Sequence, residues 1–326
     1  MLWFLAGIDQ HVNVLLRNCI RPSTQKTYDQ GLKTYHNFCD IHSLTPFPPS
    51  EASILRFISH LDILHLRSQT IKVYVAGIDH FCVLKNWDKP SSLPRVKLLL
   101  RAVSIKDAPA KSKLPITVDI LNLMKPFVLS DTVDGAMFWA AMCVAHFGLL
   151  RVSEFTVNTK FNSNHHVSLH EAKVSKDRIS IFVPRSKTDL ANQGFHLDFI
   201  CNGTNVCPFC ALLDYFKTRN ITHVEQPLFQ LTNGKALTRF HFVEKTKSVL
   251  SILGMDKKSY SSHSFRSGGA TSAAQAGLKD WQLKHLGRWK SEAYHSYVKP
   301  SQCMLENLRA KLVGKKVDRD SYDFKF

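Results

Sequence analysis

A basic, proline-interrupted stretch most constrains how this chain can fold. Residues 106–115 read Lys-Asp-Ala-Pro-Ala-Lys-Ser-Lys-Leu-Pro, which is polar and lacks apolar periodicity. Proline removes a backbone donor and breaks helices, so this composition is typical of a linker. The 326 residues are enough for a hydrophobic core on each side of it. We therefore predict an N-terminal domain over residues 1–105, a basic linker at 106–116 and a second domain over residues 117–326.

The first domain is predicted to be helical. Apolar residues recur at helical spacing after Pro22, Ser50, Ser68 and Pro94, which indicates four helices. Ser50 is a typical helix cap, and the preceding Thr-Pro-Phe-Pro-Pro is a typical break between helices.

The second domain is predicted to combine helices with a small sheet. Residues 117–127 and 132–150 favour helices, and the second is apolar enough to be buried. Residues 179–183 and 195–199 favour two strands joined by a polar hairpin, and the chain is again mainly helical from Cys210. The predicted fold class is therefore mainly α with a small antiparallel β-sheet, in two domains of which the second is α+β.

The charge balance is strongly basic. Forty-three Lys and Arg residues against 26 Asp and Glu give a net charge of +17, which favours a polyanionic partner. An anionic membrane surface is a weaker alternative, because no basic amphipathic helix stands out and no segment is long enough to span a bilayer. The start of the chain lacks the basic segment of a signal peptide. We expect a soluble intracellular protein with no membrane partner and no small-molecule substrate.

The eight cysteines do not form a disulfide framework in a chain of this length, so we expect reduced thiols. Cys201, Cys207 and Cys210, with His196, permit a zinc site. The Cys-Pro-Phe-Cys pair has no second pair at finger-like spacing, and a loop before a helix is the favoured interpretation. We expect no metal and no cofactor.

The second domain carries four cationic side chains, an indole and a tyrosine in short motifs. They are Arg151 in Gly-Leu-Leu-Arg-Val-Ser-Glu, Lys187 in Arg-Ser-Lys-Thr, His263 and Arg266 in His-Ser-Phe-Arg-Ser-Gly-Gly, Trp289 in Leu-Gly-Arg-Trp, and Tyr297 in Tyr-Val-Lys. Cleaving a phosphodiester without a metal requires fixed donors around the phosphate and a nucleophile such as a tyrosine hydroxyl. A phosphotyrosyl ester conserves the bond energy, so rejoining needs no ATP. Taken singly, each residue has a structural explanation as a helix-end cation, a cap or a core aromatic.

Local spacing supports the same chemistry. Glu154 lies three residues after Arg151 and can orient its guanidinium. His263 and Arg266 share one face near a helix start, and the two glycines after Ser267 permit close backbone approach.

The complete set, in this order, resembles the active-site motifs of the tyrosine recombinases, or phage-integrase family, whose catalytic core is related to type IB topoisomerases. The sequence Gly-Arg-Trp-Lys-Ser-Glu-Ala-Tyr-His-Ser-Tyr is most similar to recombinases of eukaryotic mobile elements, the DIRS-like and Crypton groups. The resemblance covers most of the chain. It implies a helical core-binding domain that clamps duplex DNA, followed by a catalytic domain.

The resemblance also implies residue roles. Arg151, Arg266, His263 and Trp289 would hold the scissile phosphate, Lys187 would be the general acid, and Tyr297 would form a 3′-phosphotyrosyl link. In the family the tyrosine usually lies nine residues after the tryptophan or histidine, whereas Tyr297 lies eight after Trp289. Tyr294 is therefore a rival nucleophile. Tyr297 is favoured because an apolar and then a basic residue follow it.

Further expectations concern partners. Exposed cations of the first domain are either phosphate contacts or a solvated basic face; they are Lys26, Lys33, Arg67, Lys72 and Arg95. The tail has apolar residues at helical spacing that pack in cis or dock on a neighbouring protomer in a homo-tetramer on DNA; they are Met304, Leu305, Leu308 and Leu312. The DNA substrate and the eukaryotic resemblance imply a nuclear location.

The function predicted from sequence is a site-specific recombinase that cleaves and rejoins double-stranded DNA. One alternative is a monomeric, type IB-like topoisomerase that relaxes supercoils. A second is a domesticated DNA-binding protein that keeps the fold without turnover.

Overall fold

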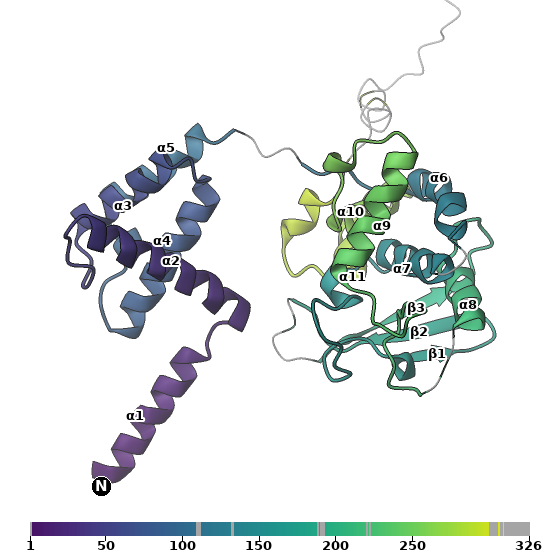
Figure 1. Ribbon diagram of the computed structural model, residues 1–326, viewed down its shortest axis with the longest axis horizontal. Coiled ribbons are helices and arrows are strands. Elements are labelled where there is room, and N and C mark those ends of the chain that lie inside the picture. The colour runs from purple at the N-terminus through teal and green to yellow at the C-terminus, as the bar shows by residue number, and fades with distance from the viewer. Residues whose placement is uncertain are drawn as a thin grey trace, which may run out of the picture. The chain divides into compact units, whose positions relative to one another are not determined.

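A computed structural model describes most of the chain. The described residues are 2–108, 112–131, 134–187, 189, 193–219, 221, 223–299, 306 and 309, without the side chains of residues 2–6 and 17. The chain divides into two compact units, residues 1–111 and 112–326, and each is described by itself (Figure 1).

The first unit is entirely helical in its described residues. Its elements are α1 (Leu2–Arg17), α2 (Pro22–Ile41), α3 (Glu51–Ile63), α4 (Ser68–Leu84), a 3-10 turn η1 (Pro90–Ser92) and α5 (Pro94–Lys106). The four helices predicted from sequence are confirmed as α2 to α5. Helix α1 was not predicted, and its apolar side chains Ile8, Val12 and Leu15 are exposed.

Helices α2 and α4 pack closely because glycines lie at their crossing. A Cβ atom added to Gly31 would come within 2.8 Å of the Tyr74 Cα, and one added to Gly77 within 2.9 Å of the Tyr28 carbonyl oxygen. Beside this crossing, the buried Tyr35 hydroxyl is 2.8 Å from Ser53 Oγ, which satisfies both hydroxyls inside an apolar core.

The second unit combines helices with one sheet. Its elements are α6 (Val118–Leu129), α7 (Gly135–Phe147), η2 (Val152–Glu154), η3 (Leu169–Glu171), β1 (Ala172–Val174), β2 (Arg178–Val183), β3 (Phe195–Ile200), α8 (Pro208–Thr218), α9 (Arg239–Ile252), η4 (Lys257–Ser259), α10 (His263–Gln275), α11 (Asp280–Gly287) and η5 (Glu292–Ser296). The apolar helix predicted over residues 132–150 is shorter, because α7 ends at Phe147 and Leu149 adopts a left-handed backbone with φ 46°.

The sheet is antiparallel with strand order β1–β2–β3. Strand β2 pairs with β3 from Arg178 opposite Ile200 to Val183 opposite Phe195, and alternate β2 residues are buried. Helix α7 is buried along almost its whole length, and α8 packs against α7 and β3 (Figure 1). The predicted class, mainly α with a small antiparallel sheet, is confirmed. Of the three strands, the short β1 was missed.

Helix α10 lies unusually close to neighbouring backbone. A Cβ atom on Gly268 would collide with the backbone of Ile116, and one on Gly269 with the carbonyl oxygen of His146. The close approach predicted from the two glycines is therefore present. It sets the position of the α10 N-terminus, which carries His263 and Arg266.

In the part of the chain that the structure describes, no helix is long and apolar enough to cross a membrane. The apolar tail residues of the sequence prediction lie outside the described residues; they are Met304, Leu305, Leu308 and Leu312.

Candidate active site

The turn after α7 holds Arg151 through Glu154. The Arg151 backbone N–H donates to Glu154 Oε2 at 2.8 Å, and its Nη1 donates to Glu154 Oε1 at 2.9 Å. Glu154 is only 3% exposed, so its carboxylate is committed to this pairing. Nη1 also donates to Ser186 Oγ at 3.3 Å, which ties the Arg151 turn to the residue before Lys187. The orienting role predicted for Glu154 is confirmed.

Arg266 lies at the centre of the group and is fully buried. Its Nη1 donates to the carbonyl oxygen of Leu149 and its Nη2 to that of Gly287 at 2.6 Å. Burial, and then the charge of Arg151, lower the pKa of Arg266 to about 10, so it remains a cation at neutral pH. Its guanidinium carbon lies 4.5 Å from the ring centre of Trp289 and 5.3 Å from that of Tyr297.

His263 opens α10 and reaches solvent. Partial desolvation lowers its pKa, and so do the charges of four neighbouring cations, which are Arg239, Arg266, Arg151 and Lys187 in order of their effect. Three of these four were singled out from the sequence. The exposed Lys187 side chain is thus within electrostatic reach of the same site.

Trp289 and Tyr297 close the site on the other side of Arg266. The Trp289 ring is 8% exposed and lies 5.3 Å from the Tyr297 ring. Its buried Nε1 has no hydrogen-bond partner among the described residues. A buried donor without a partner is costly, and a ligand oxygen is one way to satisfy it.

The two tyrosines differ in their surroundings. Tyr294 is 1% exposed, and desolvation together with the negative charges of Asp280 and Glu292 raises its pKa to about 12. Tyr297 is half-buried, and its carbonyl oxygen accepts from Ser267 Oγ at 2.5 Å. The contrast favours Tyr297 as the nucleophile, since a buried phenol with a raised pKa is both inaccessible and hard to ionise.

Arg288 is a residue that the sequence reasoning missed. It ends α11 in a left-handed conformation with φ 55°, and its Nη2 donates to the carbonyl oxygens of Gly148 at 3.0 Å and Leu149 at 2.9 Å. The same Nη2 lies 3.7 Å from Glu154 Oε2. Arg288 precedes Tyr297 by nine residues, the spacing usual in the family, and this signal could have found it.

A basic cavity of about 850 Å³ adjoins His263 through Ser261 and Ser262. The cations that line it are Lys113, Arg239, Lys247, Lys257 and Lys258. Arg239, the second missed residue, starts α9 and lies in both the cavity and the charge field of His263. The excess of positive charge in this cavity favours a phosphate backbone as its ligand.

The three cysteines considered for a zinc site lie close together in the structure. The sulfurs of Cys201, Cys207 and Cys210 lie within 4.8 Å of one another. His196 is not part of this group, because its ring packs against Phe182 at 4.9 Å in the sheet. The helix predicted after the loop is present as α8.

Known proteins were compared with this chain by sequence and by structure. No protein-family model matches the chain. A curated relative, "Integrase/recombinase xerD homolog" of Selenomonas ruminantium, is 22% identical over 304 residues, which are 90% of this chain and 86% of the relative.

Solved structures share the architecture at low sequence identity. The XerH site-specific recombinase bound to palindromic difH substrate, in a post-cleavage complex, is 14% identical with a TM-score of 0.60, over 88% of this chain and 79% of that one. The lambda integrase dimer bound to a COC' core site is 12% identical with a TM-score of 0.60, over 90% and 76%. This chain has the tyrosine recombinase fold.

A third tyrosine recombinase structure agrees. The Tn1549 transposon integrase in complex with transposon right end DNA is 14% identical with a TM-score of 0.58, over 90% of this chain and 95% of that one. The predicted tyrosine recombinase fold is confirmed, and the curated relative agrees with the family that the motifs resemble.

Proposed function

We propose that this protein is a tyrosine recombinase, a DNA strand transferase that cleaves and rejoins double-stranded DNA without metal or ATP. The observation that carries the proposal is that the predicted catalytic side chains lie around Arg266 and His263. The charge of Arg151 acts on Arg266, and the charges of Arg266, Arg151 and Lys187 all act on His263. Trp289 and Tyr297 lie against the Arg266 guanidinium. Their motifs are spread over almost 150 residues of sequence, and the fold gathers all of them.

The phosphate would be bound by the two arginines and their neighbours. Arginine is suited to this role because its planar fork pairs with two phosphate oxygens and stays charged. Arg151 is oriented by Glu154, so its fork is preorganised. Both Nη atoms of the buried Arg266 donate to carbonyl groups, and its Nε, which has no partner among the described residues, would be its donor to the phosphate. His263 would add a third donor at the solvent side, and the unpartnered Trp289 Nε1 a fourth.

The chemical step uses Tyr297 and Lys187. The Tyr297 hydroxyl oxygen attacks phosphorus and gives its proton to solvent water, and the bond from phosphorus to the 5′ oxygen breaks. Lys187 donates a proton to that oxygen, which leaves as a 5′-hydroxyl. Rejoining runs the same step in reverse: a 5′-hydroxyl displaces Tyr297, and Lys187 takes up the proton.

The finer features of the proposal concern assembly and origin. Four protomers on two duplexes would exchange strands, with the tail that begins near Pro300 docking on a neighbour. The helical first unit would add phosphate contacts, because Lys26, Lys33 and Lys72 are exposed on it. The motif from Gly287 to Tyr297 leads us to propose a eukaryotic mobile element of the DIRS-like or Crypton groups as its source, and the nucleus as its location.

The test is covalent capture on DNA without added metal ion. A library of duplexes with randomised sequence and a nick beside each candidate cleavage position traps the enzyme, because the released short strand diffuses away. Adducts that survive denaturing gels are sequenced, and the recovered sites are joined to a second duplex in a strand-exchange assay. Recombinant products support the recombinase. Relaxation of supercoils without recombinants supports a topoisomerase, and tight binding without adducts supports an inactive DNA-binding protein.

A further inference from the structure

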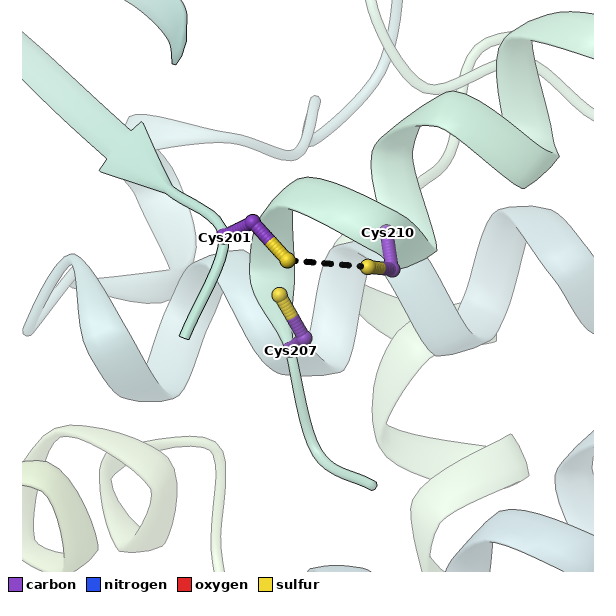
Figure 2. Close-up of side chains that lie close together, drawn as sticks. All are labelled: Cys201, Cys207 and Cys210. Carbon is purple, nitrogen blue, oxygen red and sulfur yellow. Dashed lines mark hydrogen bonds between the residues drawn. The ribbon is translucent and has the colours of Figure 1, made fainter. Parts of the chain in front are cut away.

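Three thiols gather where the sheet passes into α8. Cys201 directly follows β3, Cys207 directly precedes α8, and Cys210 lies in the first turn of that helix (Figure 2). Cys201 and Cys210 are exposed and Cys207 is buried, so the group opens to solvent on one side. Nothing in the proposed strand transfer uses these side chains.

The spacing of the sulfurs fits a tetrahedral thiolate site. A zinc ion about 2.3 Å from each sulfur in tetrahedral geometry separates two sulfurs by about 3.8 Å. Sγ of Cys201 lies 3.7 Å from Sγ of Cys210, and all three sulfurs lie within 4.8 Å of one another (Figure 2). A disulfide requires sulfurs only about 2.05 Å apart, so none of the three pairs is bonded.

A helix N-terminus and two charged side chains lie beside the thiols. Cys207 is the N-cap residue of α8 and therefore lies at the positive N-terminal end of that helix. Lys125 and Asp214 both line the small cavity that contains Cys207 and Cys210, so one positive and one negative side chain border it. Three thiolates and one divalent cation would carry a net charge of minus one, which the solvent-exposed side of the group allows water to hydrate.

We propose that Cys201, Cys207 and Cys210 bind a zinc ion, with water in the fourth position. Of the described residues, only these three bring ligand atoms into the group, and its solvent-exposed side admits the water. Soft thiolate ligands select zinc over magnesium or calcium. The ion would fasten the end of β3 to the start of α8. It would thereby stabilise the strand pair whose connecting segment carries Lys187.

The test is metal content and its spectroscopic signature in the full-length protein. The chain is purified under reducing conditions with zinc present, desalted and measured for bound zinc by mass spectrometry of the metal. One zinc per chain is expected in the wild type. Each of Cys201→Ser, Cys207→Ser and Cys210→Ser should lose it, whereas Cys19→Ser, which removes an exposed cysteine between α1 and α2, should retain it. Cobalt in place of zinc should show thiolate-to-metal charge-transfer absorption that weakens in the three variants.

Several results would overturn the proposal. They are a reduced wild type without zinc, retention of the metal by all three variants, and a stable disulfide among the three cysteines in the purified protein. If Cys207→Ser fails to fold, the variants of the exposed Cys201 and Cys210 decide the outcome. Zinc content is measured without DNA, so its result does not depend on whether the chain is a recombinase.

Discussion

At the scale of single residues, the Leu149 carbonyl oxygen connects two arginines of the site. It accepts from Arg266 and also from Arg288, and Leu149 and Arg288 both adopt left-handed backbone conformations. Such conformations are uncommon in non-glycine residues and persist where surrounding contacts fix them. These contacts link the Arg151 turn to the segment that carries Trp289. We infer that Arg288 is a positioning residue: its hydrogen bonds to Gly148 and Leu149 hold the turn that carries Arg151.

Replacing Arg288 by lysine should therefore disturb the site while keeping the charge. A lysine has no planar fork and cannot reproduce the bonds to Gly148 and Leu149, so the free energy of unfolding should fall by roughly 1–3 kcal/mol. Adduct formation on nicked DNA should slow by about tenfold or more, the equivalent of about 1.4 kcal/mol in the barrier. Lys290→Ala, an exposed neighbour, serves as the control. An unchanged rate of adduct formation in the Arg288 variant would contradict the positioning role of Arg288.

A second residue-scale prediction concerns His146, which is buried beside α10. Burial lowers its pKa to about 4, although its Nδ1 lies 3.1 Å from the Ile116 carbonyl oxygen. The unfolded chain binds the proton near pH 6.5, so folding stability is lost as the pH falls from about 6.5 to about 4. The full loss approaches roughly 3 kcal/mol, from about 1.36 kcal/mol per pKa unit.

The measurement is urea unfolding of the wild type and His146→Gln at several pH values. The stability advantage of the wild type over this variant should narrow as the pH falls through this window, because the other histidines titrate in both proteins. A constant difference between the two proteins would show that His146 does not titrate in this way.

At the scale of elements, α10 is the part whose placement decides the site. It presents His263 and Arg266, and its glycines contact backbone that precedes α6 and ends α7. Gly268→Ala would drive a methyl group into the Ile116 backbone, and overpacking of this kind typically costs about 1–3 kcal/mol. We expect that loss in chemical unfolding, together with weaker adduct formation.

The control for this prediction is Gly7→Ala in α1, where an added Cβ meets nothing within 4 Å. Alanine favours a helix interior by up to about 1 kcal/mol over glycine, so this variant should be neutral or more stable. Equal stability of the Gly268 variant and the wild type would contradict the tight packing of α10.

Most elements could be predicted from the sequence because their signals are local. The i, i+3 pair of Arg151 and Glu154 and the glycines after Ser267 have the contacts that their spacing indicates. Strand β1 was missed because three residues carry too little periodicity. The bonds of Arg288 to a turn about 140 residues earlier depend on tertiary structure that no local pattern encodes. The three cysteines were singled out as a group from their spacing, but the sequence did not decide between a zinc site and a loop, and it wrongly suggested His196 as a companion.

At the scale of the whole molecule, the net charge of +17 predicts binding to DNA that weakens steeply with salt. Each phosphate contact contributes about 0.9 to the slope of log K against log salt concentration. Replacing Lys257 and Lys258, which line the basic cavity, by glutamine should reduce the slope by up to about 1.8. Fluorescence anisotropy with a labelled duplex measures this. Lys176→Gln, in the exposed β1–β2 turn, should leave the slope unchanged, and equal slopes in all three proteins would exclude the cavity as a DNA contact.

The most direct test of the central claim is the identity of the residue that becomes linked to DNA. Wild type, Tyr297→Phe and Tyr294→Phe are incubated with a nicked substrate recovered from the library, and the adduct is digested and sequenced by mass spectrometry. The account predicts a DNA-linked peptide at Tyr297, no adduct in Tyr297→Phe, and an adduct in Tyr294→Phe. A link to Tyr294, or an adduct that persists in Tyr297→Phe, would contradict it.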